Sequence, residues 1–461
     1  MSDVAQPRTL AQWLAFIETL HPKSIAMGLE RIASVAARMG IRIDCPVVTV
    51  AGTNGKGSTC AIVEAIYRHA GYRTGLYTSP HLLRFNERVR IDGIDATDEA
   101  LVEAFEAVET ARAAHPDPLR RGEREPSASE AGERATPLTY FEFSTLAALR
   151  LFAEARLDVL ILEVGLGGRL DAVNIVDPDV AIVTTVDIDH VDWLGSTRDA
   201  IGREKAGVFR TGKPALCGDP DPPRTLVEHA EAIGALLWRI GVDYRYEAER
   251  TQWRYDGPGG ARYGLPLPAL RGDYQLRNAA TALAAIDALH SRLPVAAGAV
   301  RDGLVNVELP GRLQVLPGRP SIVLDVAHNA QAARVLADAL STMGYFPRTF
   351  AVFGMLADKD IEAVVRALAP RIDCWYVAPL PGARGASVTR LESALAAAAI
   401  DAQSIRPFGD VADAFAAARN DAHDTDRIAA FGSFLTVAAV LAAARARRGP
   451  VWQWQNPPTS T

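Results

Sequence analysis

Cysteine is scarce in this sequence, which has only Cys45, Cys60, Cys217 and Cys374 among its 461 residues. These residues lie far apart, with no CxxC pair and none of the spacings of a metal site. This pattern gives no sign of a disulfide-stabilised scaffold or of a cysteine-ligated metal centre. We expect four reduced thiols, as is usual inside the cytoplasm.

Long apolar runs and an excess of basic residues are also missing. No run reaches the roughly 20 residues of a membrane-spanning helix, and the first residues, MSDVAQPRTLAQWLAF, do not resemble a secretory signal. Lysine and arginine total 49 against 55 acidic residues, a net charge of -6. This balance gives no overall attraction to nucleic acid or to an anionic membrane. We expect a soluble, cytoplasmic monomer that binds neither.

The length of the chain exceeds what one hydrophobic core usually supports, which predicts two domains. Short β-branched runs alternate with alanine-rich stretches in the first two-thirds, which is typical of a mainly parallel sheet covered by helices. The breaker pair in LPGR, residues 309–312, precedes a second β/α series. We predict an α/β fold with one domain at residues 1–309 and a smaller Rossmann-like domain at residues 310–461.

The clearest predicted strands of the first domain are buried runs at residues 46–52, 157–165 and 180–186. Each runs into glycine, acidic or polar residues, at the carboxyl edge where such sheets bind ligands. In the second domain, strands are predicted in SIVLDVAHN, RTFAVFGML, CWYVAPL and RIAAFGS.

Two further segments differ from this β/α pattern. Aromatic and charged residues alternate around GPGG at residues 244–270, which predicts a peripheral hairpin, with a helix from Gln275. Residues 111–137 are rich in proline, glycine and charge without apolar periodicity. They predict a mobile surface loop, to which we assign no function.

The segment VVTVAG, TNGKGST and CAIVEAIYRHA reads as strand, glycine loop and helix. Gly52, Gly55 and Gly57 allow the backbone to turn tightly and to direct amide groups at phosphate oxygens, beside a helix N-terminus. Lys56 supplies a positive charge for the outer phosphates, and Ser58 or Thr59 a hydroxyl near a metal ion. The order of elements predicts a P-loop-type ATPase domain.

This loop departs from the GxxxxGK[ST] pattern. Val50 stands at the position of the first glycine, and Gly57 separates Lys56 from the hydroxyl. The alternative is a glycine turn that binds nothing. The flanking strand and helix favour nucleotide binding.

Two more strand ends carry groups that can bind magnesium. Glu163 ends the second predicted strand, and His190 follows the third among Asp187, Asp189 and Asp192. A carboxylate at such an edge can hold a magnesium ion. The alternatives are a solvated carboxylate, a structural histidine and a solvated acidic loop.

Lys205 lies in GREKAGVFRTGKP, at a predicted helix start. Nothing in its spacing separates it from a solvated surface lysine.

Several segments keep a fixed order along the chain: MGLERIASVAARMG, VAGTNGKGST, SPHLLRFNERVR, LTYFEF, ILEVGLGGRLDAVNIV, DHVDWLG, IGREKAGVFR, LRNAATALAA, LPGR, LDVAHN, GMLADKD and FGSF. With them the sequence resembles the Mur ligase superfamily and, within it, the dihydrofolate synthase/folylpolyglutamate synthase family. The resemblance spans nearly the whole chain; only residues 111–137 and the termini lack a counterpart.

The resemblance implies an ATP-dependent acid–amino-acid ligase that uses Mg²⁺. Its substrates would be dihydropteroate with L-glutamate, and then reduced folates with further glutamates. The γ-phosphoryl group of ATP would pass to a substrate carboxylate, and the glutamate amine would attack the acyl phosphate. A relative that only elongates folates stays open, because dual activity depends on the GLER and TYFEF segments together.

The resemblance also implies a set of ligand-binding residues. Magnesium ligands would be Ser79, Glu163 and His190. Residues that bind ATP would be Thr53, Asn54, Gly55, Lys56, Gly57, Ser58, Asn278, Arg312 and Asp325, completed when the domains close. Catalytic residues would be Lys56, His190, Lys205 as a carbamylated lysine that helps to hold magnesium, and His328, which positions glutamate or the intermediate.

For the pterin, the resemblance points to three segments: Ala26, Met27, Gly28 and Leu29; Thr139, Tyr140, Phe141 and Glu142; and Leu170, Asp171 and Ala172. Asp171 is suited to hydrogen bonds with pterin nitrogens, whereas Ala26 would contribute its backbone only. Phe141 can stack on a pterin ring, although an aromatic residue in such a pattern is more often part of the core.

Two other classes of protein use a similar loop. A GTP switch would read guanine with an NKxD motif, which this sequence lacks. A P-loop kinase would phosphorylate a hydroxyl group and would need no second α/β domain. Formation of ADP and phosphate only in the presence of both an amine and a carboxylate separates the ligase from both.

Overall fold

The computed structural model describes residues 8–21, 25–113 and 136–448. Most of the predicted loop at 111–137 therefore lies outside the described residues. The chain splits into two compact units, which are described separately. The first consists of Met1–His81, Phe85–Ala269 and Gln275–Val307, and the second of Leu82–Arg84, Leu270–Tyr274 and Glu308–Thr461.

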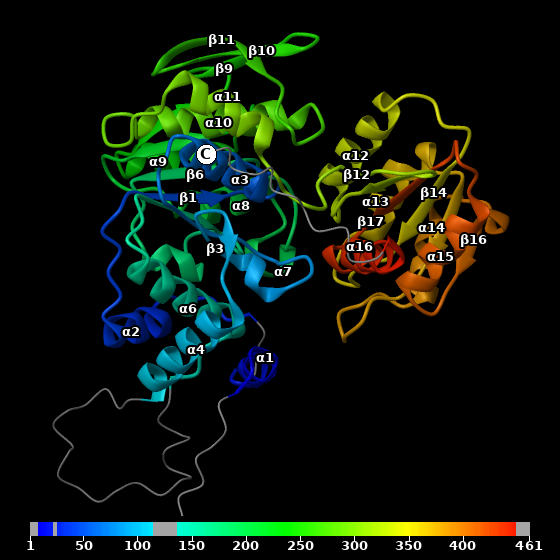
Figure 1. The fold of residues 1–461 in the computed structure, drawn as a ribbon, viewed down its shortest axis with the longest axis horizontal. Coiled ribbons are helices and arrows are strands. Elements are labelled where there is room, and N and C mark those ends of the chain that lie inside the picture. Colours follow the sequence, from blue (N-terminus) through cyan, green and yellow to red (C-terminus); the bar gives the residue numbers. More distant parts are fainter. Residues whose placement is uncertain (1–7, 22–24, 114–135, 449–461) are drawn as a thin grey trace, which may run out of the picture. The chain divides into compact units, whose positions relative to one another are not determined.

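An eight-stranded sheet forms the centre of the first unit (Figure 1), with the order β4-β3-β2-β5-β1-β6-β7-β8. Its strands are β1 (Val47–Ala51), β2 (Thr74–Tyr77), β3 (Val89–Ile91), β4 (Ile94–Asp95), β5 (Val159–Glu163), β6 (Val180–Val183), β7 (Pro214–Cys217) and β8 (Leu236–Arg239). Only β3 and β4 pair antiparallel to their neighbours. The mainly parallel sheet is confirmed, with the three predicted strands as its adjacent, fully buried β5, β1 and β6.

Helices cover both faces of this sheet. They are α1 (Leu10–Thr19), α2 (Glu30–Met39), α3 (Lys56–His69), α4 (Asp98–Ala113), α6 (Tyr140–Glu154), α7 (Val191–Leu194), α8 (Arg198–Ala206), α9 (Arg224–Ala232), α10 (Tyr274–Ala288) and α11 (Ala297–Asn306). Val47 and Ala51 of β1 pack in one core with Phe143 of α6, whereas Val48 and Val50 point to the opposite face. That face is covered by α3, which contacts β1, β2 and β5.

Apolar residues recur at helical spacing from Ile25 to Met39, but the helix there is shorter than this spacing indicates. It begins only at Glu30, because Gly28 has a φ of 142°, which no helical residue adopts. Ile32 and Val35 are buried as expected. The residues before the helix are therefore left as an extended segment.

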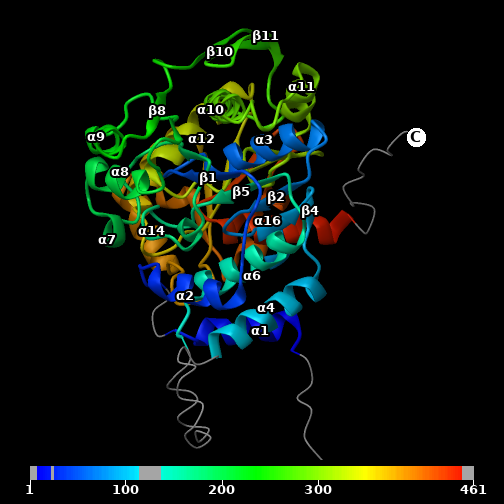
Figure 2. The ribbon, with the colours of Figure 1, turned by 90° about the vertical axis from the view of Figure 1, so that its left-hand side faces the viewer.

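The predicted hairpin forms a small antiparallel sheet of β9 (Arg245–Ala248), β10 (Gln252–Gly257) and β11 (Gly260–Pro266). Gly257 pairs with Gly260 across the turn. Strand β9 was not predicted because its side chains are mostly exposed and charged. Figure 2 shows β10 and β11 at one end of the first unit, beyond α10 and α11.

The second unit has a six-stranded sheet with the order β12-β13-β17-β14-β15-β16. Its elements are β12 (Gln314–Leu316), β13 (Ser321–Leu324), α12 (Ala330–Thr342), β14 (Thr349–Phe353), α13 (Ile361–Leu368), β15 (Cys374–Val377), α14 (Val388–Ala397), β16 (Ile405–Pro407), α15 (Val411–Asp421), β17 (Arg427–Phe431) and α16 (Phe434–Arg448). All four predicted strands are present. The short edge strands β12 and β16 were missed. Along the described part of the chain, no helix is long and apolar enough to cross a membrane.

Candidate active site

Four neighbouring parallel strands, β2, β5, β1 and β6, end at the same edge of the first sheet. Ser79 follows β2, Glu163 ends β5, the glycine loop follows β1 and His190 follows β6. The backbone amide of Ser79 donates to Oε2 of Glu163 at 3.0 Å. The topology therefore brings segments that are far apart in the sequence to one edge.

The glycine loop is fixed against the segment after β6. The amide of Thr53 donates to the carbonyl of Thr185 at 2.7 Å, and the hydroxyl of Thr184 donates to the carbonyl of Asn54 at 2.6 Å. Gly52 has a φ of 146°, and a Cβ there would lie 1.9 Å from Oγ1 of Thr184. Only glycine fits this approach of two backbone segments.

Helix α3 begins directly after the loop. Gly55 is its N-cap, with a φ of 88°, and the first helical hydrogen bond runs from the amide of Thr59 to the carbonyl of Gly55 at 2.9 Å. The amides of Gly57 and Ser58 are therefore available to phosphate oxygens at the positive end of the helix. Nζ of Lys56 lies 3.0 Å from the carbonyl oxygen of Gly52, so its charge is held over the loop.

Asn278 lies beside this loop, as the resemblance implies for a residue that binds ATP. A Cβ on Gly55 would lie 2.7 Å from Oδ1 of Asn278. Asn278 donates to Gln275 at 2.9 Å, and Gln275 donates to the hydroxyl of Ser58 at 3.3 Å. These buried amides connect α10 to the start of α3.

We predict that Gly52→Ala destabilises the fold by about 2 kcal/mol and weakens ATP binding, because the methyl group meets Thr184 and the backbone is strained. Thermal unfolding and ATP titration measure both effects. Gly71→Ala is a matched control, since Gly71 has a φ of 85° and open space around its Cβ position. Equal losses in the two variants would contradict the steric explanation.

Three further predicted residues, Arg312 and Asp325 for ATP and His328 for catalysis, lie in the second unit. The carboxylate of Asp325 is buried and accepts from the amides of Leu313 and Ala327, both at 2.8 Å. Burial raises the pKa of Asp325, although the charge of Arg312 opposes this. Arg312 and His328 both lie against the ring of Phe434. The unit thus gathers Arg312, Asp325 and His328 in one place.

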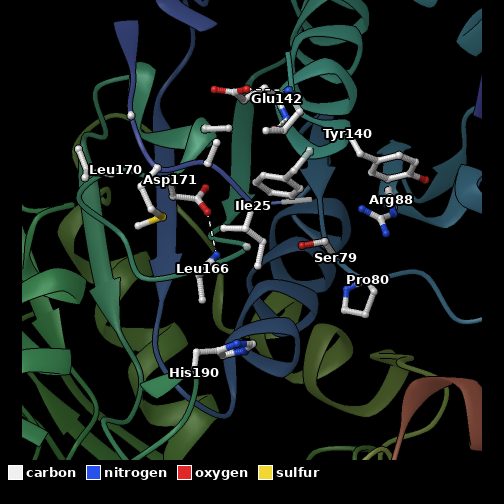
Figure 3. Close-up of a pocket in the computed structure, with 17 residues that line it drawn as sticks. Ile25, Ser79, Pro80, Arg88, Tyr140, Glu142, Leu166, Leu170, Asp171 and His190 are labelled. Carbon is white, nitrogen blue, oxygen red and sulfur yellow. Dashed lines mark hydrogen bonds between the residues drawn. The ribbon is translucent and has the colours of Figure 1, made fainter. Parts of the chain in front are cut away.

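A cavity of about 290 Å³ lies in the first unit (Figure 3). It contains all the predicted pterin residues except Leu29, which precedes α2, and it also contains Ser79 and His190. The 17 lining residues are Ile25, Ala26, Met27, Gly28, Ser79, Pro80, Arg88, Thr139, Tyr140, Phe141, Glu142, Gly165, Leu166, Leu170, Asp171, Ala172 and His190. Ile25, Pro80, Arg88, Gly165 and Leu166 were not predicted individually, although four of them lie within or beside predicted motifs.

Asp171 points into this cavity from the loop after β5 (Figure 3), and its residue is only 4% exposed. Its oxygens accept from the amides of Leu166 at 2.8 Å and Val173 at 3.1 Å. Burial raises the pKa of Asp171 to about 6, against the lowering effect of these amides and of Lys56. Each carboxylate oxygen has a second lone pair that can accept from a ligand.

The side chains of Thr139 and Glu142 have structural partners. They form a capping box at the start of α6, with bonds of 2.8 Å and 3.2 Å between them. Glu142 also pairs with Arg31 at 3.0 Å, and Arg31 donates to the carbonyl of Ala26 at 2.8 Å. These polar groups hold the wall of the cavity in shape.

Phe141 forms part of the same wall. Its ring lies 6.0 Å from that of the buried Tyr77. A Cβ on Gly165 would lie 2.6 Å from its Cζ, so glycine is needed where the loop passes the ring. Phe141 is thus both partly core and partly exposed to the cavity.

Lys205 does not lie at a helix start, as the sequence predicts, but in the last turn of α8. It is only 4% exposed, so the interpretation as a surface lysine is wrong. Its pKa is lowered to about 7, chiefly by burial and then by the charge of Lys56. No hydrogen bond or ion pair joins its amine to another described residue. A buried amine of this kind is available for modification as the neutral base.

The donors implied for magnesium fit a small, hard cation. Glu163 provides a buried carboxylate beside Ser79, and Ser79 and His190 line the same cavity. His190 has a φ of 54°, a backbone conformation that residues other than glycine rarely adopt. Among the described residues no three His, Cys, Asp or Glu side chains form a metal cluster.

Two family models match the chain. The Mur ligase middle domain matches residues 131–286, and the Mur ligase glutamate ligase domain matches residues 311–434. The dihydrofolate synthase/folylpolyglutamate synthase of Escherichia coli is 46% identical over 440 residues, 95% of this chain and 96% of that protein.

Solved structures give the same result. The structure of E. coli FolC in complex with DHPP and ADP has a TM-score of 0.85 and 45% identity, and covers 96% of this chain and 99% of that one. A bifunctional folylpolyglutamate synthase/dihydrofolate synthase with Mn, AMPPNP and L-glutamate bound has a TM-score of 0.82 and 45% identity, and covers 95% and 98%.

Proposed function

Because the chain belongs to the dihydrofolate synthase/folylpolyglutamate synthase family of Mur ligases, we propose that it joins L-glutamate to dihydropteroate and adds further glutamates to reduced folates. The observation that carries this proposal is the shared sheet edge. There the glycine loop for ATP lies next to Ser79 and Glu163, and Ser79 also lines the cavity for the acid substrate.

The reaction begins with transfer of the γ-phosphoryl group of ATP to the substrate carboxylate. Lys56 and the amides of Gly57 and Ser58 stabilise the charge that develops on the phosphoryl oxygens. The glutamate amine then attacks the acyl phosphate, and the tetrahedral intermediate collapses to the amide and phosphate. No side chain acts as a nucleophile in either step.

Ser79, Glu163 and His190 are the residues that would hold Mg²⁺, which when bound supplies charge neutralisation at the phosphates. We assign ATP contacts to residues 53–58 and Asn278, and to Arg312 and Asp325. We assign the positioning of glutamate or the intermediate to His328.

The cavity suits a reduced pterin ring. Its walls are largely apolar, and Asp171 offers an ionised acceptor for the N–H groups of the ring. Leu170 and Phe141 provide the surface against which the flat ring packs. Binding of the pterin thus depends on one buried carboxylate.

This dependence predicts a pH effect. Because Asp171 has a pKa of about 6, the carboxylate is ionised at pH 7.5 and mostly protonated at pH 5. Dihydropteroate affinity should fall about tenfold between these values, one decade per pH unit below the pKa. Fluorescence titration measures the affinity. Asp171→Asn should bind weakly with no step near pH 6, and a step that persists in this variant would assign it to another group.

We also propose that the protein works in the cytoplasm. Its four cysteines are free thiols in the structure, as expected for a reducing compartment.

The proposal is tested with purified protein, ATP, Mg²⁺ and L-glutamate. ADP should form with dihydropteroate and also with tetrahydrofolate. Turnover of tetrahydrofolate alone would identify a monofunctional folylpolyglutamate synthase, and turnover of neither acid would contradict the proposal.

A further inference from the structure

Among the described residues that line the cavity, Arg88 is the only lysine or arginine. It comes from the short turn Phe85–Arg88 that leads into β3, and it is only 8% exposed. Taking a guanidinium out of water is costly unless anions or good acceptors replace the water. The position of Arg88 therefore calls for a partner.

The contacts of Arg88 use only part of the hydrogen-bonding capacity of its guanidinium group. Nε donates to Nδ1 of His81 at 2.9 Å. The guanidinium carbon lies 5.5 Å from the ring centre of Phe85 and 5.6 Å from that of Tyr140. Among the described residues no carboxylate forms an ion pair with Arg88. The Nη1 and Nη2 groups thus have donors left for a ligand.

The acidic residues of the cavity are engaged elsewhere. Glu142 pairs with Arg31 and caps α6. Asp171 accepts from backbone amides of its own loop. In Figure 3, Arg88 lies beside Tyr140 and near Ser79, whereas Asp171 lies on the other side of the cavity. The cavity therefore has an acceptor at one side and a cationic donor at the other.

We propose that Arg88 binds the carboxylate of the acid substrate and so aligns the extended molecule with its pterin at Asp171 and its reacting carboxylate near Ser79. The assignment rests on the proposed function, since that reaction needs a carboxylate in this cavity. A guanidinium presents two parallel N–H groups that match both carboxylate oxygens. The contacts of Arg88 with the rings of Phe85 and Tyr140 hold that fork in place before the substrate arrives.

The test is a binding cycle without ATP that compares dihydropteroate with its uncharged carboxamide. Arg88→Gln should weaken binding of dihydropteroate at least about tenfold, the effect of one charge-assisted hydrogen bond. Binding of the carboxamide should change less than about twofold. Equal losses for the two ligands, or no loss, would overturn the assignment, because a merely structural Arg88 does not distinguish them.

Arg150→Gln serves as the matched control, because Arg150 is exposed on α6 and pairs with Glu154. Its affinities should equal those of the unaltered protein. If Arg88→Gln does not fold, Arg88→Lys gives the same comparison: a larger loss for dihydropteroate than for the carboxamide supports the assignment, and equal losses contradict it. Failure of the unaltered protein to bind dihydropteroate would instead contradict the proposed function.

Discussion

Replacing Lys56 with alanine is expected to lower kcat by about 10²- to 10³-fold and to leave the fold intact. The ammonium group lies over the glycine loop, 3.0 Å from the carbonyl of Gly52, where we propose that it binds the outer phosphates of ATP. Loss of one preorganised donor at the developing charge has an effect of this size. Steady-state release of ADP measures it.

Arg68→Ala is the control for Lys56→Ala, since Arg68 lies in the last turn of the same helix and makes only a weak ion pair at 3.9 Å. This variant should keep its activity. An unchanged kcat in Lys56→Ala would show that Lys56 does not stabilise the transferred phosphoryl group.

Replacing Lys205 with alanine is expected to reduce activity about 10- to 100-fold, the loss seen when a group that supports a metal site is removed. A carbamate forms when a neutral amine reacts with CO₂, and Lys205 has a pKa of about 7, so much of its amine is neutral at physiological pH. The product is an anionic oxygen donor in a buried position. Assays with purified variants measure the loss.

Carbamylation has its own signature. Activity of the unaltered protein should fall in CO₂-free buffer and return with bicarbonate. Lys213→Ala, which removes a half-exposed lysine that pairs with Asp179, should behave like the unaltered protein. Full activity of Lys205→Ala, or a bare ammonium on Lys205 in a liganded structure, would contradict the modification.

The central sheet was predictable because its middle strands contain few polar residues. β1, β5 and β6 consist almost entirely of buried β-branched and leucine residues, and each ends at a polar residue or glycine. Parallel strands place those ends at one edge, which predicted the neighbourhood of Glu163 and the glycine loop. Strands β9, β12 and β16 were missed because they are short or largely exposed and carry little apolar signal.

The cavity was predictable only through the family resemblance. The first of its three pterin segments lies more than 100 residues before the other two in the sequence. No local pattern joins Met27 to Phe141 or Asp171. Burial of Lys205 depends on the packing of α8 against the loop after β5, where Gly168 lies close to the carbonyls of Glu204 and Lys205. Such tertiary contacts cannot be predicted from the sequence around a single lysine.

The position of Arg88 in the cavity was likewise not predictable from the sequence. In SPHLLRFNERVR it is one of three arginines, and only the structure shows which of them reaches the cavity. Arg90, two residues later, pairs with the buried Glu64 at 3.2 Å instead.

The most direct test of the ligase mechanism follows the oxygen atoms of the acid substrate. Dihydropteroate labelled with ¹⁸O in its carboxylate is incubated with ATP, Mg²⁺, L-glutamate and the protein, and the phosphate is analysed by mass spectrometry. An acyl phosphate route transfers one labelled oxygen to each phosphate released and sustains repeated ADP formation only when acid and amine are both present. Unlabelled phosphate, or ADP formation without the amine at the full rate, would contradict the account.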